Sequence, residues 1–297
     1  MLHFLPRPLI GTLSLLLYIV NTLFWFVPIM LLAVLKLPPL TRWQSWMTYL
    51  LDACAVSWIS VNNFTTRLFT RIRWQISGLE TLSRKDWYLV LANHQSWADI
   101  LVLQKVFNRK IPFIKFFLKK ELIYVPIIGL CWWALDFPFM KRYSKAFLQR
   151  NPHLQGKDIE TTRKACRKFR FKPAAIMNFV EGTRFTKHKH DKQQSPYQNL
   201  LKPKAGGAAF VLGAMGEQLH KILDITIHYP QGIPSFWDYI SGKVSDIKVQ
   251  IKVLPITADL LGDYNDAQYR ERFQQWINQL WHEKDQQLNA LKHGVKQ

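Results

Sequence analysis

Hydrophobic and polar positions change their pattern once along this chain, near residue 70. Leu9 to Leu35 is an uncharged run, interrupted only by Asn21, a few hydroxyls and Pro28. As a helix it would extend roughly 40 Å, more than the ~30 Å hydrocarbon core of a bilayer requires. A signal peptide has a shorter apolar region and a small-residue cleavage site, so we expect a retained membrane helix. Pro28 should bend it, which leaves a full span and a half-embedded helix both open.

A second helical segment follows the Pro38-Pro39 break, over residues 40–69. It places several Trp and Tyr side chains among polar residues, and these two residue types prefer the membrane–water boundary. We therefore predict an amphipathic helix that lies on or dips into the interface. An ordinary core helix is the alternative for this segment. The flanking cations Arg7, Lys36 and Arg42 indicate little about orientation.

From residue 71 onward, short β-like runs alternate with helical ones. The strand-like runs are 72–77, 87–92, 111–116, 174–180, 223–229 and 247–254, and the helical ones are 97–107, 158–171, 205–219 and 266–291. Such alternation predicts an α/β fold, with a mixed, mostly parallel sheet flanked by helices and preceded by N-terminal membrane helices. We divide the chain into a membrane-associated helical segment, 1–70, and an α/β domain, 71–297.

The composition points to an anionic partner. Forty Lys and Arg against 20 Asp and Glu give a formal charge of +20. Nucleic acid, an acidic membrane surface, a phosphorylated substrate or an acidic carrier protein would each suit such a charge. The three cysteines are far apart and predict neither a disulfide framework nor a metal site. A reduced, cytosolic environment is the simplest account of the main domain.

The polar turn after the apolar run 87–92 carries His94 and Asp99. Histidine is the side chain best suited to exchange protons near neutral pH, and a neighbouring carboxylate can fix its orientation. Five residues along one straight helix would place the two on different faces. They can meet only if His94 lies in the turn and Asp99 in the first turn of the helix, with Ser96 as N-cap. The same spacing from Ser96 to Asp99 also fits a capping box without catalysis.

Two further turns present cations. Residues 174–180 end in Glu181-Gly182-Thr183-Arg184, where a turn glycine and a guanidinium fixed by Glu181 would suit a phosphate. An exposed turn with a weak surface ion pair is the alternative. Lys141-Arg142 forms the other cationic turn and has the same two interpretations.

Four segments together resemble the blocks of the PlsC-type 1-acylglycerol-3-phosphate acyltransferases, a glycerolipid acyltransferase family. Asn93–Asp99 is similar to the family's His-x4-Asp block, and Phe179–Arg184 to its Phe-Pro-Glu-Gly-Thr-Arg block. Phe139–Arg142 resembles the second block and Ile222–Ile227 the fourth, in the same order and spacing. The residues of the four blocks taken together are most similar to those of the bacterial YihG-type branch. The chain departs from the family at four positions, with Asp136 for Gly, Val180 for Pro, Phe185 for Ser and Asp224 for Pro.

The resemblance implies transfer of a fatty acyl group from a thioester to the sn-2 hydroxyl of lysophosphatidic acid or a related lysophospholipid. It implies His94 as general base, oriented by Asp99, and an acyl-CoA or acyl carrier protein as co-substrate, with no metal or other cofactor. The expected phosphate-binding residues are Glu181, Gly182, Thr183, Arg184, Lys141 and Arg142. The expected location is the bacterial inner membrane, with the active domain on the cytoplasmic side and an anionic membrane surface as partner.

Several alternatives stay open on the residues alone. A membrane-tethered nucleic-acid-binding protein would suit the charge, but the chain shows no recognised binding module, so we do not expect nucleic acid as partner. A non-catalytic lipid-binding scaffold is a third possibility. Residues 122–139 could line an acyl channel or belong to the core. The basic helix 158–171 could be a solvated face or a docking patch, and His188 and His190 are weak metal candidates in a charged loop.

Overall fold

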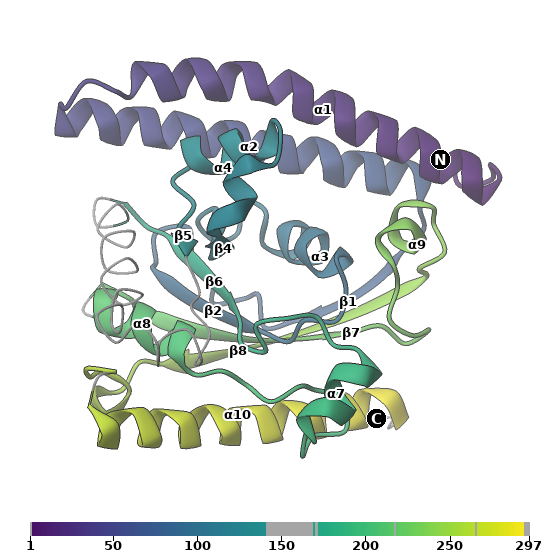
Figure 1. Ribbon diagram of the computed structural model, residues 1–297. Coiled ribbons are helices and arrows are strands. Elements are labelled where there is room, and N and C mark those ends of the chain that lie inside the picture. Colours follow the sequence, from purple (N-terminus) through teal and green to yellow (C-terminus); the bar gives the residue numbers. More distant parts are fainter. Residues whose placement is uncertain (1, 141–168, 170–171, 217, 265, 294–297) are drawn as a thin grey trace.

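The computed structural model describes residues 2–140, 169, 172–216, 218–264 and 266–293. Helices α1 (Arg7–Leu35) and α2 (Thr41–Phe69) form a long antiparallel pair across the top of the molecule (Figure 1). Both predicted N-terminal helices are thus confirmed, with boundaries within two residues. Inside the pair, the Asn21 amide donates to Asn62 Oδ1 over 2.8 Å, which satisfies two buried polar groups.

Helix α1 lies along the domain. It packs against α2 over its length and also contacts the short helices α4 (Ile128–Ala134) and α9 (Phe236–Ile240). Among the described helices, α1 is the one long and apolar enough to cross a membrane, yet only 17% of its most apolar window is buried. Its outer face therefore consists of exposed apolar side chains.

The predicted mixed, mostly parallel sheet is confirmed. Its six strands are ordered β1-β8-β7-β2-β6-β3, and only β7 and β8 pair antiparallel. The strands are β1 (Arg73–Ser77), β2 (Tyr88–Ala92), β3 (Ile114–Phe116), β6 (Ala175–Phe179), β7 (Lys221–His228) and β8 (Asp246–Pro255). A second sheet pairs the short strands β4 (Leu118–Lys119) and β5 (Phe139–Met140). Because β2, β6 and β3 are parallel, the turns that follow them gather at one edge.

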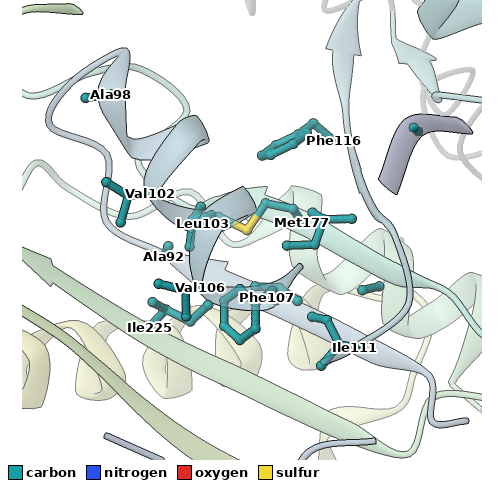
Figure 2. Packing of buried hydrophobic residues seen from close by; sticks show 14 of the residues in the cluster. Ala92, Ala98, Val102, Leu103, Val106, Phe107, Ile111, Phe116, Met177 and Ile225 are labelled. Carbon is teal, nitrogen blue, oxygen red and sulfur yellow. The ribbon is translucent and has the colours of Figure 1, made fainter. Parts of the chain in front are cut away.

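The central strand β2 is buried on both faces. Alternate residues contribute to two hydrophobic clusters, Tyr88 and Val90 to one and Leu89 and Leu91 to the other. Helices α3 (Ala98–Phe107) and α4, with the α1–α2 pair beyond them, cover the first face, and Figure 2 shows α3 seated over Ala92 and Met177. Helices α8 (Gly206–Met215) and α10 (Ala267–His293) cover the second face (Figure 1).

Some local predictions differ from the structure. Residues 187–193, expected in a charged loop, form helix α7 (Lys187–Gln193), whose first turn is capped by the Thr186 side chain. The predicted strand over 111–116 begins only at Ile114. The 3₁₀ helices η1 (Lys120–Tyr124) and η3 (Ala258–Leu260) and the helices α4 and α9 were not predicted. The predicted helix over 158–171 lies almost entirely outside the described residues.

Candidate active site

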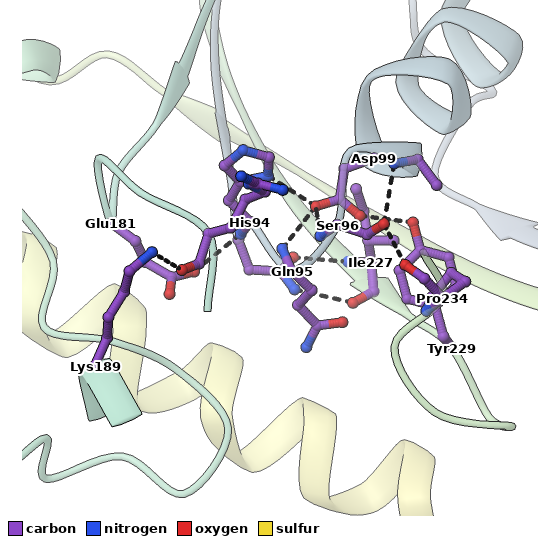
Figure 3. A network of polar contacts seen from close by, with 12 residues as sticks. His94, Gln95, Ser96, Asp99, Glu181, Lys189, Ile227, Tyr229 and Pro234 are labelled. Carbon is purple, nitrogen blue, oxygen red and sulfur yellow. Dashed lines mark hydrogen bonds and ion pairs between the residues drawn. The ribbon is translucent and has the colours of Figure 1, made fainter. Parts of the chain in front are cut away.

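His94 and Asp99 meet at the carboxyl end of β2, as the spacing predicted. His94 Nδ1 lies 2.9 Å from Asp99 Oδ2, and the carboxylate is fully buried (Figure 3). A carboxylate only accepts hydrogen bonds, so Nδ1 carries the proton and Nε2 keeps a lone pair. Among the described residues, Nε2 has no hydrogen-bond partner, and 12% of the His94 side chain is exposed. The pair therefore presents a basic nitrogen to solvent.

Asp99 also forms one half of the predicted capping box, the bond that its carboxylate accepts from the backbone N–H of Ser96. Its Oδ2 accepts the backbone N–H groups of Gln95 at 2.6 Å and Ser96 at 2.8 Å. The Ser96 hydroxyl in turn accepts the N–H of Ala98 over 3.0 Å. Helix α3 begins at Ala98, one residue later than an N-cap at Ser96 would give. These local bonds fix the carboxylate in the orientation that reaches His94.

Glu181 occupies a place that the sequence did not predict. Its fully buried carboxylate accepts the backbone N–H of His94 through Oε1 and that of Leu201 through Oε2, each over 2.9 Å. Burial raises the pKa of Glu181 to about 8. The predicted pairing with the Arg184 guanidinium is wrong, because both oxygens are engaged by backbone donors. Glu181 is therefore a support of the His94 turn, out of reach of a phosphate.

The turn from Glu181 to Phe185 is bound to His94 at both ends. Besides the Glu181 contact, the N–H of Phe185 donates to the His94 carbonyl over 2.7 Å. Gly182 turns the chain between them with a φ of +69°, a conformation that favours glycine. The two polar turns expected at this edge are thus joined by backbone hydrogen bonds.

Arg184 lies over the same catalytic turn. Its guanidinium carbon is 4.3 Å from the centre of the Trp97 ring, in a cation–π contact. Within the described part of the chain the guanidinium forms no ion pair, so its donors are available to an anion. Lys189 Nζ donates to the Thr183 hydroxyl at 2.8 Å and to the Arg184 carbonyl at 3.0 Å. The ammonium of Lys189 therefore holds Thr183 and Arg184 in place.

Three supporting residues were missed by sequence reasoning. The Tyr229 hydroxyl donates to Asp99 Oδ1 over 2.6 Å from the end of β7. The Asn93 side chain exchanges two 2.9 Å hydrogen bonds with the backbone of Ile227, which ties the turn to β7. The Phe179 ring stacks on the imidazole of His94 with centroids 3.8 Å apart. Asn93 and Phe179 belong to the recognised blocks, whereas Tyr229 follows β7 at the same sheet edge.

The remaining predictions concern residues outside the two turns of the site. Lys141 and Arg142 lie outside the described residues. Asp136, which replaces a family glycine, has a φ of +58°, and this left-handed conformation explains why glycine suits the position. Its carboxylate pairs with Lys36 at the end of α1. The stretch 122–139 contributes Cys131 and Phe137 to the hydrophobic core. Across the described ranges, no three His, Cys, Asp or Glu side chains are grouped as metal ligands.

The sequence of this chain matches a known protein family. The model of the family described as Acyltransferase matches residues 73–229, just over half of the chain. The chain belongs to this Acyltransferase family. The matched region runs from the first strand of the sheet to Tyr229, and it includes both turns of the site.

Curated relatives carry more specific names. The chain is 29% identical over 224 residues to 1-acyl-sn-glycerol-3-phosphate acyltransferase 3 of Arabidopsis thaliana, covering 69% of this chain and 53% of that protein. It is 26% identical over 226 residues to 1-acyl-sn-glycerol-3-phosphate acyltransferase gamma of Mus musculus, covering 72% and 54%. The chain thus spans about half the length of these relatives.

A solved structure shares the fold. The 1-acyl-sn-glycerophosphate (LPA) acyltransferase PlsC from Thermotoga maritima superposes with a TM-score of 0.55 at 14% sequence identity. The match covers 96% of each chain, so it includes the N-terminal helices as well as the sheet. This similarity confirms the predicted glycerolipid acyltransferase-like fold of the chain.

Proposed function

We propose that this protein transfers a fatty acyl group from an acyl thioester to the sn-2 hydroxyl of lysophosphatidic acid or a related lysophospholipid. The observation that carries the proposal is a pair of groups on two hydrogen-bonded turns, neither of which has a polar partner among the described residues. They are Nε2 of His94, backed by Asp99, and the Arg184 guanidinium. A base for a hydroxyl and a cation for a phosphate are the two groups that this acceptor requires. The names of the curated relatives support the same acceptor.

The proposed reaction is a direct transfer with His94 as general base. Nε2 takes the proton of the acceptor hydroxyl while its oxygen attacks the thioester carbonyl, a role worth typically ~10²–10⁴-fold. Asp99 stabilises the imidazolium that forms. The tetrahedral intermediate then collapses, the C–S bond breaks, and the imidazolium returns the proton to the thiolate. Arg184 binds the acceptor phosphate, and no resident cofactor takes part.

We further propose a half-embedded position for the N-terminal helices. Helix α1 contacts α2, α4 and α9, and its outer face is apolar. Its exposed apolar side chains include Leu16, Leu17, Ile19, Val20, Leu23, Phe24, Val27, Leu31 and Val34. An in-plane helix pair would bury this face in one leaflet while keeping every contact with the domain. We propose the bacterial inner membrane, with the active domain on its cytoplasmic side.

Acyl transfer in reconstituted vesicles tests the proposal. Wild type, His94→Ala and the control His282→Ala, an exposed histidine of α10, receive labelled acyl-CoA or acyl carrier protein with lysophosphatidic acid. We expect transfer by wild type and control, and a loss of at least about 10²-fold in His94→Ala, with vesicle binding unchanged. No transfer by wild type from either donor would favour the non-catalytic scaffold. Equal activity in His94→Ala would remove this residue from the mechanism.

A further inference from the structure

A pocket of about 440 Å³ opens at the amino-terminal edge of the sheet, between α2 and the segments that lead into β2, β3 and β6. Its lining includes Tyr49, Asp52, Arg84, Lys85, Arg109 and Lys172. Arg84 and Lys85 precede β2, whereas His94 follows it. Five residues of strand span roughly 17 Å, so the pocket and the catalytic turn lie at opposite ends of the sheet. It is therefore a separate site from the acceptor phosphate position at Arg184.

The pocket gathers positive side chains that the described residues do not neutralise. Arg84, Lys85 and Arg109 are exposed, and none of them has an acidic partner among the described residues. The carboxylate that lines the pocket, Asp52, is already engaged by Lys172 and by Lys115. Three cations that share one concave space repel one another unless an anion joins them. Guanidinium and ammonium groups together match the oxygens of a phosphate.

Arg109 carries an independent indication. It follows helix α3 with a φ of +61°, in the left-handed region that strongly favours glycine at a helix end. A non-glycine residue is strained there, and such strain is typical of positions with a function. The chain places at this position a long cationic side chain that lines the pocket. The strained residue is thus also one of the cations that line the pocket.

The surroundings of the pocket indicate where its ligand comes from. Tyr49 of α2 lines the pocket and is 54% exposed, and Trp43 and Trp46 are exposed on the same helix. Trp and Tyr side chains prefer the level of the phospholipid head groups. If the outer face of α1 and α2 lies in one leaflet, the pocket beside α2 lies near the level of the phospholipid head groups.

We propose that this pocket binds the phosphate of an anionic phospholipid head group at the membrane surface. This inference rests on the membrane association proposed above and is independent of the acyl transfer reaction. Each basic residue close to an anionic surface strengthens binding roughly fivefold. A pocket that gathers three of them would select anionic over neutral lipid.

Vesicle binding by the full chain tests this proposal. We compare Arg84→Gln/Lys85→Gln with the charge-matched control Arg270→Gln/Arg272→Gln, whose exposed arginines lie on α10 at the opposite face (Figure 1). On phosphatidylcholine vesicles with added phosphatidylglycerol, we expect the pocket variant to bind roughly 10- to 30-fold more weakly and the control to lose far less. Pure phosphatidylcholine should bind both equally. Equal losses in the two variants would reduce the effect to net charge and overturn the pocket.

A second variant separates function from local structure. Arg109→Gly removes the charge and relieves the backbone, so its thermal stability should hold or rise while binding to anionic vesicles weakens. Unchanged binding would make Arg109 a helix terminus alone and contradict the proposal. Soluble glycerol 3-phosphate serves as a competitor. If it abolishes the preference for anionic over neutral vesicles, the ligand is a soluble phosphate ester, and the proposal of a lipid head group is overturned. Absence of wild-type binding to any vesicle would instead refute the membrane association itself.

Discussion

Two buried aspartates, on opposite faces of the same sheet, illustrate two uses of a charge. Asp99 is 0% exposed and Asp224 3% exposed, so both carboxylates have lost their water. Asp99 is bound by two backbone N–H groups and the Tyr229 hydroxyl, and its last partner is an imidazole whose other nitrogen has no partner in the described part of the chain. Its network ends at a reactive atom near solvent.

The network of Asp224 is closed. Its carboxylate lies 2.7 Å from Nζ of the fully buried Lys284 on α10. The same ammonium donates to the Ile225 carbonyl at 2.7 Å and to the Thr226 hydroxyl at 3.1 Å, and because it is fully buried the network is sealed from solvent. The comparison teaches that burial alone does not mark a catalytic carboxylate. The feature by which we propose Asp99 as the catalytic one is the open end of its hydrogen-bond chain at His94.

Lys284→Met should have the largest effect on the closed network. Burial raises the pKa of Asp224 and Lys284 opposes that rise, so removal of the lysine leaves an uncompensated buried carboxyl. We expect a loss of about 3–5 kcal/mol in the free energy of unfolding, measured by urea titration. The control Lys252→Met breaks an exposed ion pair with Glu283 on the same helix and should cost below about 1 kcal/mol. Equal losses would mean that Lys284 acts through packing alone.

Glu181, which supports the His94 turn, should make the stability of the protein depend on pH. Burial holds its pKa at about 8, against an ordinary 4.5. Between these two pKa values the native state keeps a proton that the unfolded chain releases. The resulting stabilisation is complete below pH 4.5 and disappears as the pH rises through about 8. At about 1.4 kcal/mol per pKa unit, the loss is on the order of a few kcal/mol. Thermal melts of wild type should fall across this window, and those of Glu181→Gln should stay flatter.

Asp99→Asn should separate catalysis from folding. The backbone N–H groups of Gln95 and Ser96 and the Tyr229 hydroxyl would hold the amide with its oxygen toward His94. The tautomer is then retained and only the negative charge opposite the imidazolium is lost. We expect kcat to fall about 10²- to 10³-fold with the melting temperature little changed. Unchanged kcat would reduce Asp99 to a helix cap and end the contrast with Asp224.

Tyr229→Phe should give the smallest effect. It removes the 2.6 Å hydrogen bond to Asp99 without touching the substrate positions, so kcat should fall about tenfold while KM stays the same. The control Tyr269→Phe removes an equally buried hydroxyl that donates to the Leu260 carbonyl, remote from the site. A change in KM, or the same kcat loss in both variants, would argue against an action of Tyr229 through Asp99.

The local pattern of the chain was enough to predict much of this molecule. The two N-terminal helices, the strands around β2 and the contact between His94 and Asp99 depend on hydrophobic periodicity and on residues less than two helical turns apart. Such features are set by short-range geometry. Helix α7 was missed because its residues are polar on every face, which hides the helical period.

Partners distant in sequence were settled only by the tertiary structure. Glu181 was expected to hold Arg184, three residues away, but the strand order places it beneath His94. The same order brings Tyr229 to Asp99, and α10 brings Lys284 to Asp224.

The sequence by itself therefore determined the main helices and strands, and that a histidine and an arginine follow parallel strands. The fold decided which buried charge stays open to solvent and which is sealed, because a buried polar group takes whatever donor the packing of remote elements supplies.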